Sequence, residues 1–373
     1  MNQNISTVSR TEWLKMLEEE YLKEFISSGG SAVKVLAVPD SMDVNSLISD
    51  IERKAEQNSY EHVFLDPLQP SPDGKKPDLH RIDKFFFAVT RKTDWIASCR
   101  QLARNYLLMN GITVPDSDDI SNAEKIAEIN DMPIHDLMNI YQTSLSQSVL
   151  RNHSFTNEFR IAITALIRSV LIADTSTPNR QELILNWFEG KTLPGSAAAL
   201  KKVRIFEKIN ITNARLMLQS YTKWLPDTGK SGLVITLDLR PYEYKKLTAA
   251  QKKSEAFNRY YKAVNENASP EELRTIVENS EFSEPEIAYT DLAYFQMLTM
   301  IRRFIDEIDI FQNFLLVVLT TPNFYKNRSL DPSVKRCFYD YDALQTRIGL
   351  EVFDANRPNP SASLVFLEEV HGQ

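Results

Sequence analysis

The stretch that decides the fold covers residues 33–55 and reads VKVLAVPDSMDVNSLISDIERKA. Its first six residues form an apolar, β-branched run that stops at Pro39, a pattern typical of a buried strand. Val44, Leu47 and Ile51 then recur at helical spacing, so an amphipathic helix follows the strand. A strand that leads directly into a helix is the unit from which parallel sheets are built.

Four further short strands are predicted at wide intervals along the chain. Each is a compact run of mainly apolar residues, and helical patterns separate one from the next. The runs cover His62–Leu65, Gly232–Leu239, Phe314–Thr320 and Ser363–Leu367. Near-continuous apolar strands that alternate with helices indicate an α/β fold, in which helices cover both faces of a mainly parallel five-stranded sheet.

Helical patterns fill the intervals between these strands. Helices are expected from Ile82 to Asn110, over residues 116–211, and over Asn213–Leu225, Asp291–Ile308 and Ser333–Phe353. The helices between the second and third strands form a large insertion. The chain then divides into an N-terminal helix with the first part of the α/β core (1–95), the helical insertion (96–211), and the second part of the core (212–373) with a charged insertion at 245–291. Because few residues follow the last strand, no separate C-terminal lid is expected.

The composition excludes several classes of protein. The 373 residues are 43% hydrophobic and 25% charged with a net charge of −7, which argues against a surface built as a whole to neutralise DNA. Cys99, Cys337 and the five histidines form no disulfide framework, zinc motif or catalytic motif, so no metal ligand or catalytic residue is predicted. No apolar run approaches the roughly 20 residues of a membrane helix, and we expect a cytoplasmic protein.

Two glycine–lysine segments imitate a phosphate-binding loop. They are Gly190–Thr192 and Gly229–Ser231, but the glycine that GxxxxGK[ST] requires five residues earlier is replaced by Leu185 and Trp224. No GxGxxG is present either, so the dinucleotide-binding motif is absent. Both segments are interpreted as ordinary loops.

Seven segments nevertheless resemble a known family in order and spacing. They are Glu12–Leu22, Gly29–Val35, Ile209–Arg215, Gly232–Leu239, Ile301–Asp306, Leu315–Phe324 and Tyr341–Ile348. Together they span most of the chain, from Glu12 to Ile348, and resemble the ATP-binding, AAA+-like P-loop proteins of BREX-type bacterial phage-defence gene clusters. The resemblance implies a P-loop NTPase-like sheet, with nucleotide beyond the carboxyl ends of its parallel strands.

The residues that the resemblance assigns to ATP and Mg²⁺ are eroded in this chain. The connection Pro39–Val44, where the phosphate loop is expected, has no glycine and no lysine. Asp238 keeps the position of a Mg²⁺ ligand, but Leu239 replaces the glutamate that polarises water. The candidate nucleotide-binding residues that remain are Gly29, Gly30, Lys34, Asp238, Thr320 and Arg347.

Two charged regions point to macromolecular partners. Lys191, Lys201, Lys202, Arg204 and Lys208 cluster around Phe206 and are candidates for contacting a nucleic-acid backbone, although the overall acidity disfavours this function. Residues 245–262 are mainly basic and residues 266–291 mainly acidic. This segregation is typical of solvated helices, and it also fits a surface for a partner protein or a second copy of the chain.

The function expected from the resemblance and the eroded motifs is non-catalytic. The chain is predicted to be a scaffold or regulatory subunit of a bacterial anti-phage defence system, which assembles with a helicase or nuclease and potentially with itself. Two alternatives stay open: an active ATP-hydrolysing AAA+-like subunit that uses Gly29, Gly30 and Lys34, and a DNA-binding adaptor.

Overall fold

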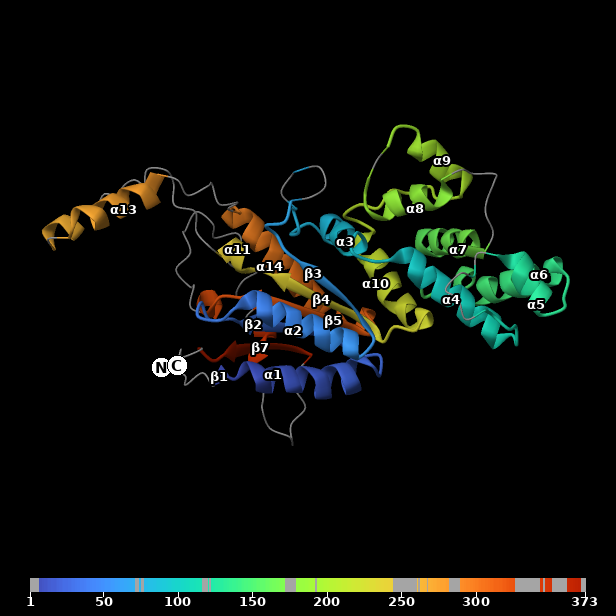
Figure 1. Ribbon diagram of the computed structural model, residues 1–373, viewed down its shortest axis with the longest axis horizontal. Coiled ribbons are helices and arrows are strands. Elements are labelled where there is room, and N and C mark those ends of the chain that lie inside the picture. The colour runs from blue at the N-terminus through green and yellow to red at the C-terminus, as the bar shows by residue number, and fades with distance from the viewer. Residues whose placement is uncertain are drawn as a thin grey trace.

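The computed structural model describes residues 7–70, 74, 77–115, 120, 122–171, 179–191, 193–243, 260, 262–266, 268–281, 289–325, 343–344, 346–350 and 361–369. These residues form an α/β sheet domain and a lobe of helices that extends from one end of it (Figure 1). The predicted α/β class is confirmed. About half of the predicted charged insertion at 245–291, namely residues 245–259, 261, 267 and 282–288, lies outside the described residues.

One parallel sheet forms the centre of the molecule. Its order is β1 (Thr7–Val8), β7 (Ala362–Leu367), β2 (Ser31–Ala37), β5 (Phe314–Thr320), β4 (Gly232–Asp238) and β3 (Tyr60–Leu65), and β6 (Gly349–Leu350) pairs with β7. All the pairings among the described strands are parallel. The predicted strands match β2, β3, β4, β5 and β7, but the count of five is wrong because β1 and β6 were missed. A strand of two residues is too short to show the residue pattern by which a strand is recognised in a sequence.

β2, β4, β5 and β7 are mainly apolar because both faces of the sheet are covered. Every residue of β2, β4, β5 and β7 is buried. Side chains alternate between two hydrophobic clusters: Val33 and Val35 of β2 belong to one, and Ala32 and Leu36 to the other. This two-sided burial explains the near-continuous apolar runs of the sequence.

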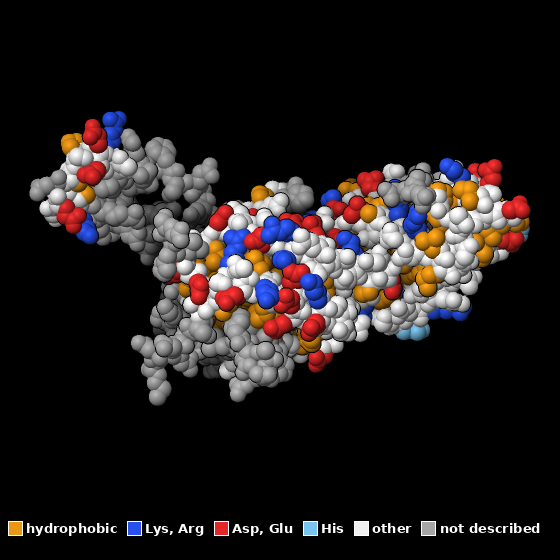
Figure 2. All heavy atoms as spheres, turned by 60° about the horizontal axis from the view of Figure 1, so that its bottom comes forward, with side chains coloured by type: hydrophobic (Ala, Val, Ile, Leu, Met, Phe, Trp, Pro, Cys, Tyr) orange, Lys and Arg blue, Asp and Glu red, His pale blue; other side chains and the backbone are white. Residues whose placement is uncertain are grey.

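The N-terminal helices cover one face of the sheet. They are α1 (Arg10–Met16), the π-helix η1 (Leu17–Ile26) and α2 (Val44–Gln57). Lys23 and Lys54 bind Glu18 on their outer surface, and these hydrogen bonds lower the pKa of Glu18 to about 2. Over the sheet domain, basic and acidic side chains are interspersed (Figure 2).

Helices from the second half of the chain, together with α3 (Ile82–Thr90), cover the opposite face. The larger ones are α10 (Ala214–Trp224) and α14 (Asp291–Asp306). Shorter segments are η3 (Leu225–Thr228), α11 (Arg240–Glu243), η4 (Ile308–Ile310) and η5 (Pro322–Tyr325), and α13 (Pro270–Glu281) lies apart from the sheet domain (Figure 1). The helix predicted at Ser333–Phe353 lies largely outside the described residues, and it is wrong at residues 349–350, which form β6.

The helical lobe shares its core with this second face. It comprises α4 (Trp95–Met109), α5 (Ala123–Ile129), α6 (Ile134–Leu145), η2 (Ser146–Leu150), α7 (Asn157–Leu171), α8 (Arg180–Phe188) and α9 (Ser196–Lys202). Trp95 stacks on Phe188 with ring centroids 4.3 Å apart and contacts Trp224 of α10 at 5.8 Å. This aromatic cluster joins the lobe to the helices that cover the sheet.

The single helix predicted from Ile82 to Asn110 is two helices in the structure. α3 ends at Thr90, and α4 begins after Asp94, whose side chain accepts a hydrogen bond of 2.9 Å from the Ala97 amide. A capping aspartate starts a new helix because it satisfies a backbone donor that lacks an intrahelical partner. Apolar residues recur at helical spacing on both sides of residues 91–94, so the sequence pattern did not show where α3 ends and α4 begins.

Candidate functional site

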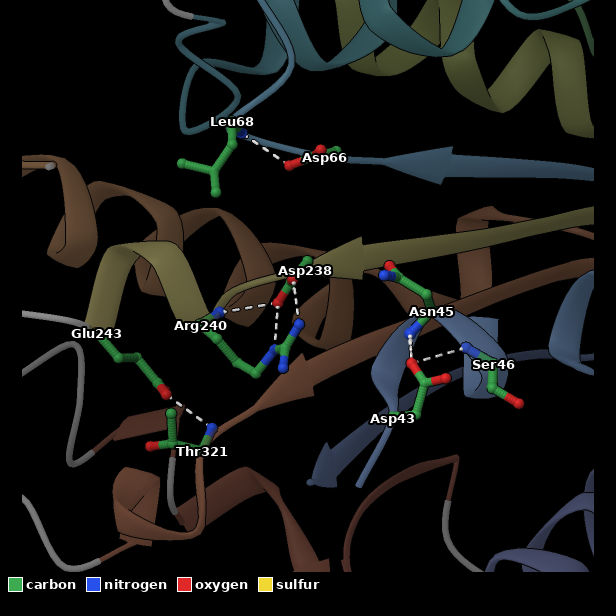
Figure 3. Close-up of polar contacts among 9 residues, drawn as sticks. All are labelled: Asp43, Asn45, Ser46, Asp66, Leu68, Asp238, Arg240, Glu243 and Thr321. Carbon is green, nitrogen blue, oxygen red and sulfur yellow. Dashed lines mark hydrogen bonds and ion pairs between the residues drawn. The ribbon is translucent and has the colours of Figure 1, made fainter. Parts of the chain in front are cut away.

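The carboxyl ends of β2 and β5 form the natural ligand-binding edge of this sheet. α2, which follows β2, packs on one face, whereas Phe324 and Leu344, which follow β5, belong to the cluster on the opposite face. Two adjacent strands whose connections leave toward opposite faces mark a topological switch point, where ligands of open α/β sheets bind. Figure 3 shows the polar side chains gathered here, from the loop before α2 to the ends of β3, β4 and β5.

The N-terminus of α2, which faces this edge, is already capped by a carboxylate. Asp43 Oδ1 accepts hydrogen bonds from the backbone amides of Asn45 at 3.1 Å and Ser46 at 3.3 Å (Figure 3). Free amides at a helix N-terminus bind the phosphate groups of nucleotides. In this protein the Asn45 and Ser46 amides donate to the Asp43 carboxylate instead.

Lys34 lies inside the sheet domain, where its side chain is bonded to η1 and β7. It is 1% exposed. Its ammonium donates hydrogen bonds to Tyr21 Oη of η1 and, at 2.8 Å, to Ser363 Oγ of β7, and it lies 4.0 Å from the centroid of the Tyr21 ring. A cation over an aromatic face is stabilised by the ring quadrupole. Lys34 therefore joins η1, β2 and β7.

Asp238 stands at the end of β4 and is bound by the arginine two residues later. Arg240 donates from Nε to Oδ1 at 2.8 Å and from Nη2 to Oδ2 at 2.7 Å, and its backbone amide donates to Oδ1 at 3.1 Å (Figure 3). Paired guanidinium–carboxylate bonds of this kind are strong and fix the geometry of both groups. The carboxylate that the resemblance assigns to Mg²⁺ is thus neutralised by a guanidinium.

Glu243 is a residue of this edge that the sequence did not indicate. It extends from α11 to the end of β5, where it accepts hydrogen bonds from Thr320 Oγ1 and, at 2.7 Å, from the Thr321 amide. Burial raises the pKa of Glu243, while the bonds from the threonines oppose the shift. Thr320, a predicted candidate, is therefore occupied by Glu243. The only sequence signal was an acidic residue shortly after a strand.

The other predicted candidates lie at the amino edge of the sheet. Gly29, at φ +96°, and Gly30 form the turn between η1 and β2, and the Gly30 amide donates to Phe25 O at 2.9 Å. Arg347 forms an ion pair with Asp306 at the end of α14, shortly before β5 begins. Of the six candidates, the structure brings only Asp238 and Thr320 to the carboxyl edge.

A cavity opens at the carboxyl edge beside β2 and β7. It has a volume of about 530 Å³ and is lined by residues that include Pro39, Pro322, Glu368 and Glu369. Lysine and arginine are absent from the described residues that line it. The two glutamates repel a triphosphate, because like charges disfavour each other at short range.

The predicted nucleic-acid candidates fall into two groups. Lys191, Lys201 and Lys208 line one cavity of about 260 Å³, together with Lys84, which the sequence analysis missed. Lys202 and Arg204 lie nearby in sequence but outside that lining. Lys84 was missed because it is more than 100 residues away from the others along the chain.

Comparisons with known proteins add no relative. Within the described residues, His, Cys, Asp and Glu side chains form no group of three or more able to hold a metal ion. None of the helices in the described ranges is both long enough and apolar enough to cross a membrane. No protein-family model, curated protein or solved structure matches the chain.

Proposed function

We propose that this chain is a non-catalytic subunit built on a P-loop-like α/β sheet. It acts as a scaffold or regulator in the kind of bacterial anti-phage assembly that the sequence resemblance implies, beside catalytic partners such as a helicase or nuclease. The placement of the loop before α2, Asp238 and Thr320 at one edge supports the P-loop-like part of the proposal, because the resemblance implies that grouping.

The capping of α2 by Asp43 is the observation that carries the non-catalytic part. Phosphoryl transfer depends on positioning the phosphates and neutralising their charge. Here the helix terminus holds a carboxylate, Lys34 is bonded within the sheet domain, and Asp238 is bonded to Arg240. Each group with which a P-loop enzyme holds Mg·ATP is missing or already engaged in an internal contact.

The helical lobe is the surface we assign to protein partners. Hydrophobic side chains are visible over this lobe in Figure 2. Described residues of the lobe with large exposed hydrophobic side chains include Leu108, Met109 and Ile134, of which Met109 is 83% exposed. Exposed apolar groups gathered in one region are typical of protein-binding surfaces.

Complementation of a deletion strain tests the proposal. Phage plating is measured with the wild-type gene, with Asp238→Asn and with Leu108→Glu/Met109→Glu. Asp238→Asn keeps an oxygen that Arg240 can bind but weakens any Mg²⁺ site, so a non-catalytic subunit retains protection. The double substitution on the lobe removes protection and the co-purification of the operon's catalytic proteins. Loss of protection in Asp238→Asn, with steady-state ATP hydrolysis by the wild type, would support the active ATPase instead.

A further inference from the structure

Two cavities lie next to each other where α3 begins. The first is the cavity of about 260 Å³ that contains Lys84, and the second, of about 270 Å³, lies between α3, α10 and α14. Consecutive residues of α3 line the two cavities, since Ile82 lines the second and Asp83 the first. Likewise, Ile209 lines the first cavity and Ile211 lines the second. We call these two cavities and their rims the basic groove.

Basic side chains dominate the basic groove although the whole protein is acidic. The lysines and arginines that line it are Arg81, Lys84, Lys191, Lys201, Lys208, Arg215 and Arg303, and the acidic residues are Asp83 and Glu207. Three of these cations are paired with carboxylates: Arg81 with Asp83 at 3.0 Å, Lys191 with Glu189 at 2.5 Å and Arg215 with Glu307 at 2.7 Å. Lys201, Lys208 and Arg303 make no side-chain hydrogen bond or ion pair within the described part of the chain. The groove thus carries positive charge that internal pairs leave uncompensated.

Exposed hydrophobic side chains lie among these cations. Phe206 is 66% exposed and Ile211 is 58% exposed, and both contribute to the lining of the groove. A flat aromatic side chain held in solvent beside lysines offers a surface on which an unpaired base stacks. The bases of a duplex are already stacked on each other, so a duplex cannot use Phe206 in this way.

We infer that the basic groove binds a segment of single-stranded nucleic acid. The lysines and arginines contact the phosphates, and Phe206 stacks on a base. The groove is lined by residues of α3, α8, α9, α10 and α14 and of the segment before α10, and its described lining includes none of Asp43, Asp238, Thr320 and Glu243. The inference therefore stands or falls independently of the non-catalytic role proposed above.

Binding of fluorescently labelled oligonucleotides tests this inference. Fluorescence anisotropy is measured with the full chain and oligo-dT, oligo-rU or a duplex of equal length, over a series of salt concentrations. We expect both single strands to bind more tightly than the duplex, and the comparison of dT with rU shows whether the sugar matters. Affinity should fall as salt rises, because counterions are released from each neutralised phosphate.

Matched variants locate the binding site. Lys201→Glu/Lys208→Glu should reduce the slope of log affinity against log salt by about 1.4, since each lysine–phosphate contact on a single strand contributes about 0.7. Phe206→Ala should weaken binding at least about fivefold through loss of stacking. The control Lys15→Glu/Lys125→Glu changes net charge equally on exposed residues of α1 and α5 and should retain wild-type affinity and slope.

Three results would overturn the inference. The first is no binding of either single strand at low salt, and the second is equal or tighter binding of the duplex. The third is an equal loss of affinity in the control and the Lys201/Lys208 variant, which would mean that net charge alone is responsible. Circular dichroism of each variant establishes that it is folded, and Phe206→Tyr, which keeps the stacking surface, should bind like the wild type.

Discussion

Removing the Asp43 carboxylate should destabilise the protein by a modest and calculable amount. Asp43→Ala deletes the oxygen that accepts from the Asn45 and Ser46 amides. Replacing an N-cap aspartate by alanine costs about 0.5–2 kcal/mol, and because Asp43 is exposed we expect about 1 kcal/mol. Asp43→Asn keeps an oxygen acceptor but loses the charge, which interacts with the helix dipole by about 0.3–1 kcal/mol. The wild type should be most stable, Asp43→Asn intermediate and Asp43→Ala least stable.

Urea denaturation followed by circular dichroism measures this order. The midpoint should shift without a change in slope, because the surface exposed on unfolding is the same. Asp40→Ala is the matched control, since Asp40 is exposed in the same loop and makes no side-chain hydrogen bond in the described structure. Equal midpoints for Asp43→Ala and the wild type, or an equal loss in Asp40→Ala, would refute the assignment of Asp43 as the group that fills the helix terminus.

Three further predictions concern side chains that are buried or half-buried. Burial, with the charge of Lys92, lowers the pKa of His62 to about 4. Its contribution to stability is present above the unfolded pKa of 6.5 and lost as pH falls toward 4; from pH 7 to pH 5 the wild type should lose about 2 kcal/mol more than His62→Gln in urea unfolding. Burial raises the pKa of Glu243, so the stability that this carboxyl group contributes is present below its unfolded pKa and is lost as the pH rises. Glu243→Gln should therefore unfold at a higher temperature than the wild type at pH 8. Equal unfolding temperatures at pH 8 would contradict the assignment of a raised pKa to Glu243. Trp224 is 0% exposed, so Trp224→Ala should lower the free energy of unfolding by about 3–5 kcal/mol. An unchanged urea midpoint would show that the aromatic cluster is not packed.

The long strands could be predicted from the sequence because the sheet is buried on both faces. β5 is apolar over Phe314–Leu319, a run that is typical of a strand covered on both faces. β1 and β6 could not be found, since a two-residue strand is defined by its partner, here β7, and not by its own residues. The break between α3 and α4 could not be found because apolar residues recur at helical spacing on both sides of it.

The sequence predicted which nucleotide-binding residues the candidate site lacks, but it did not predict the contacts that its side chains make with each other. The absence of glycine and lysine from Pro39–Val44 is visible in the letters alone. The contact between Glu243 and Thr321 joins residues 78 positions apart, and such pairs depend on the order of the strands. Lys34 could be placed in a strand, but its bond to Ser363 depends on β7 lying beside β2.

Titration of the full chain with Mg·ATP tests the central claim most directly. The account predicts no heat of binding in a calorimeter and an unchanged unfolding temperature at millimolar ATP, because the Asp43 carboxylate already accepts from the first amides of α2 and Arg240 holds Asp238. A ligand present at 100 times its Kd would add about 2.7 kcal/mol to the free energy of unfolding. Stabilisation of that size by Mg·ATP, lost in Asp238→Asn and retained in Asp40→Ala, would contradict the account.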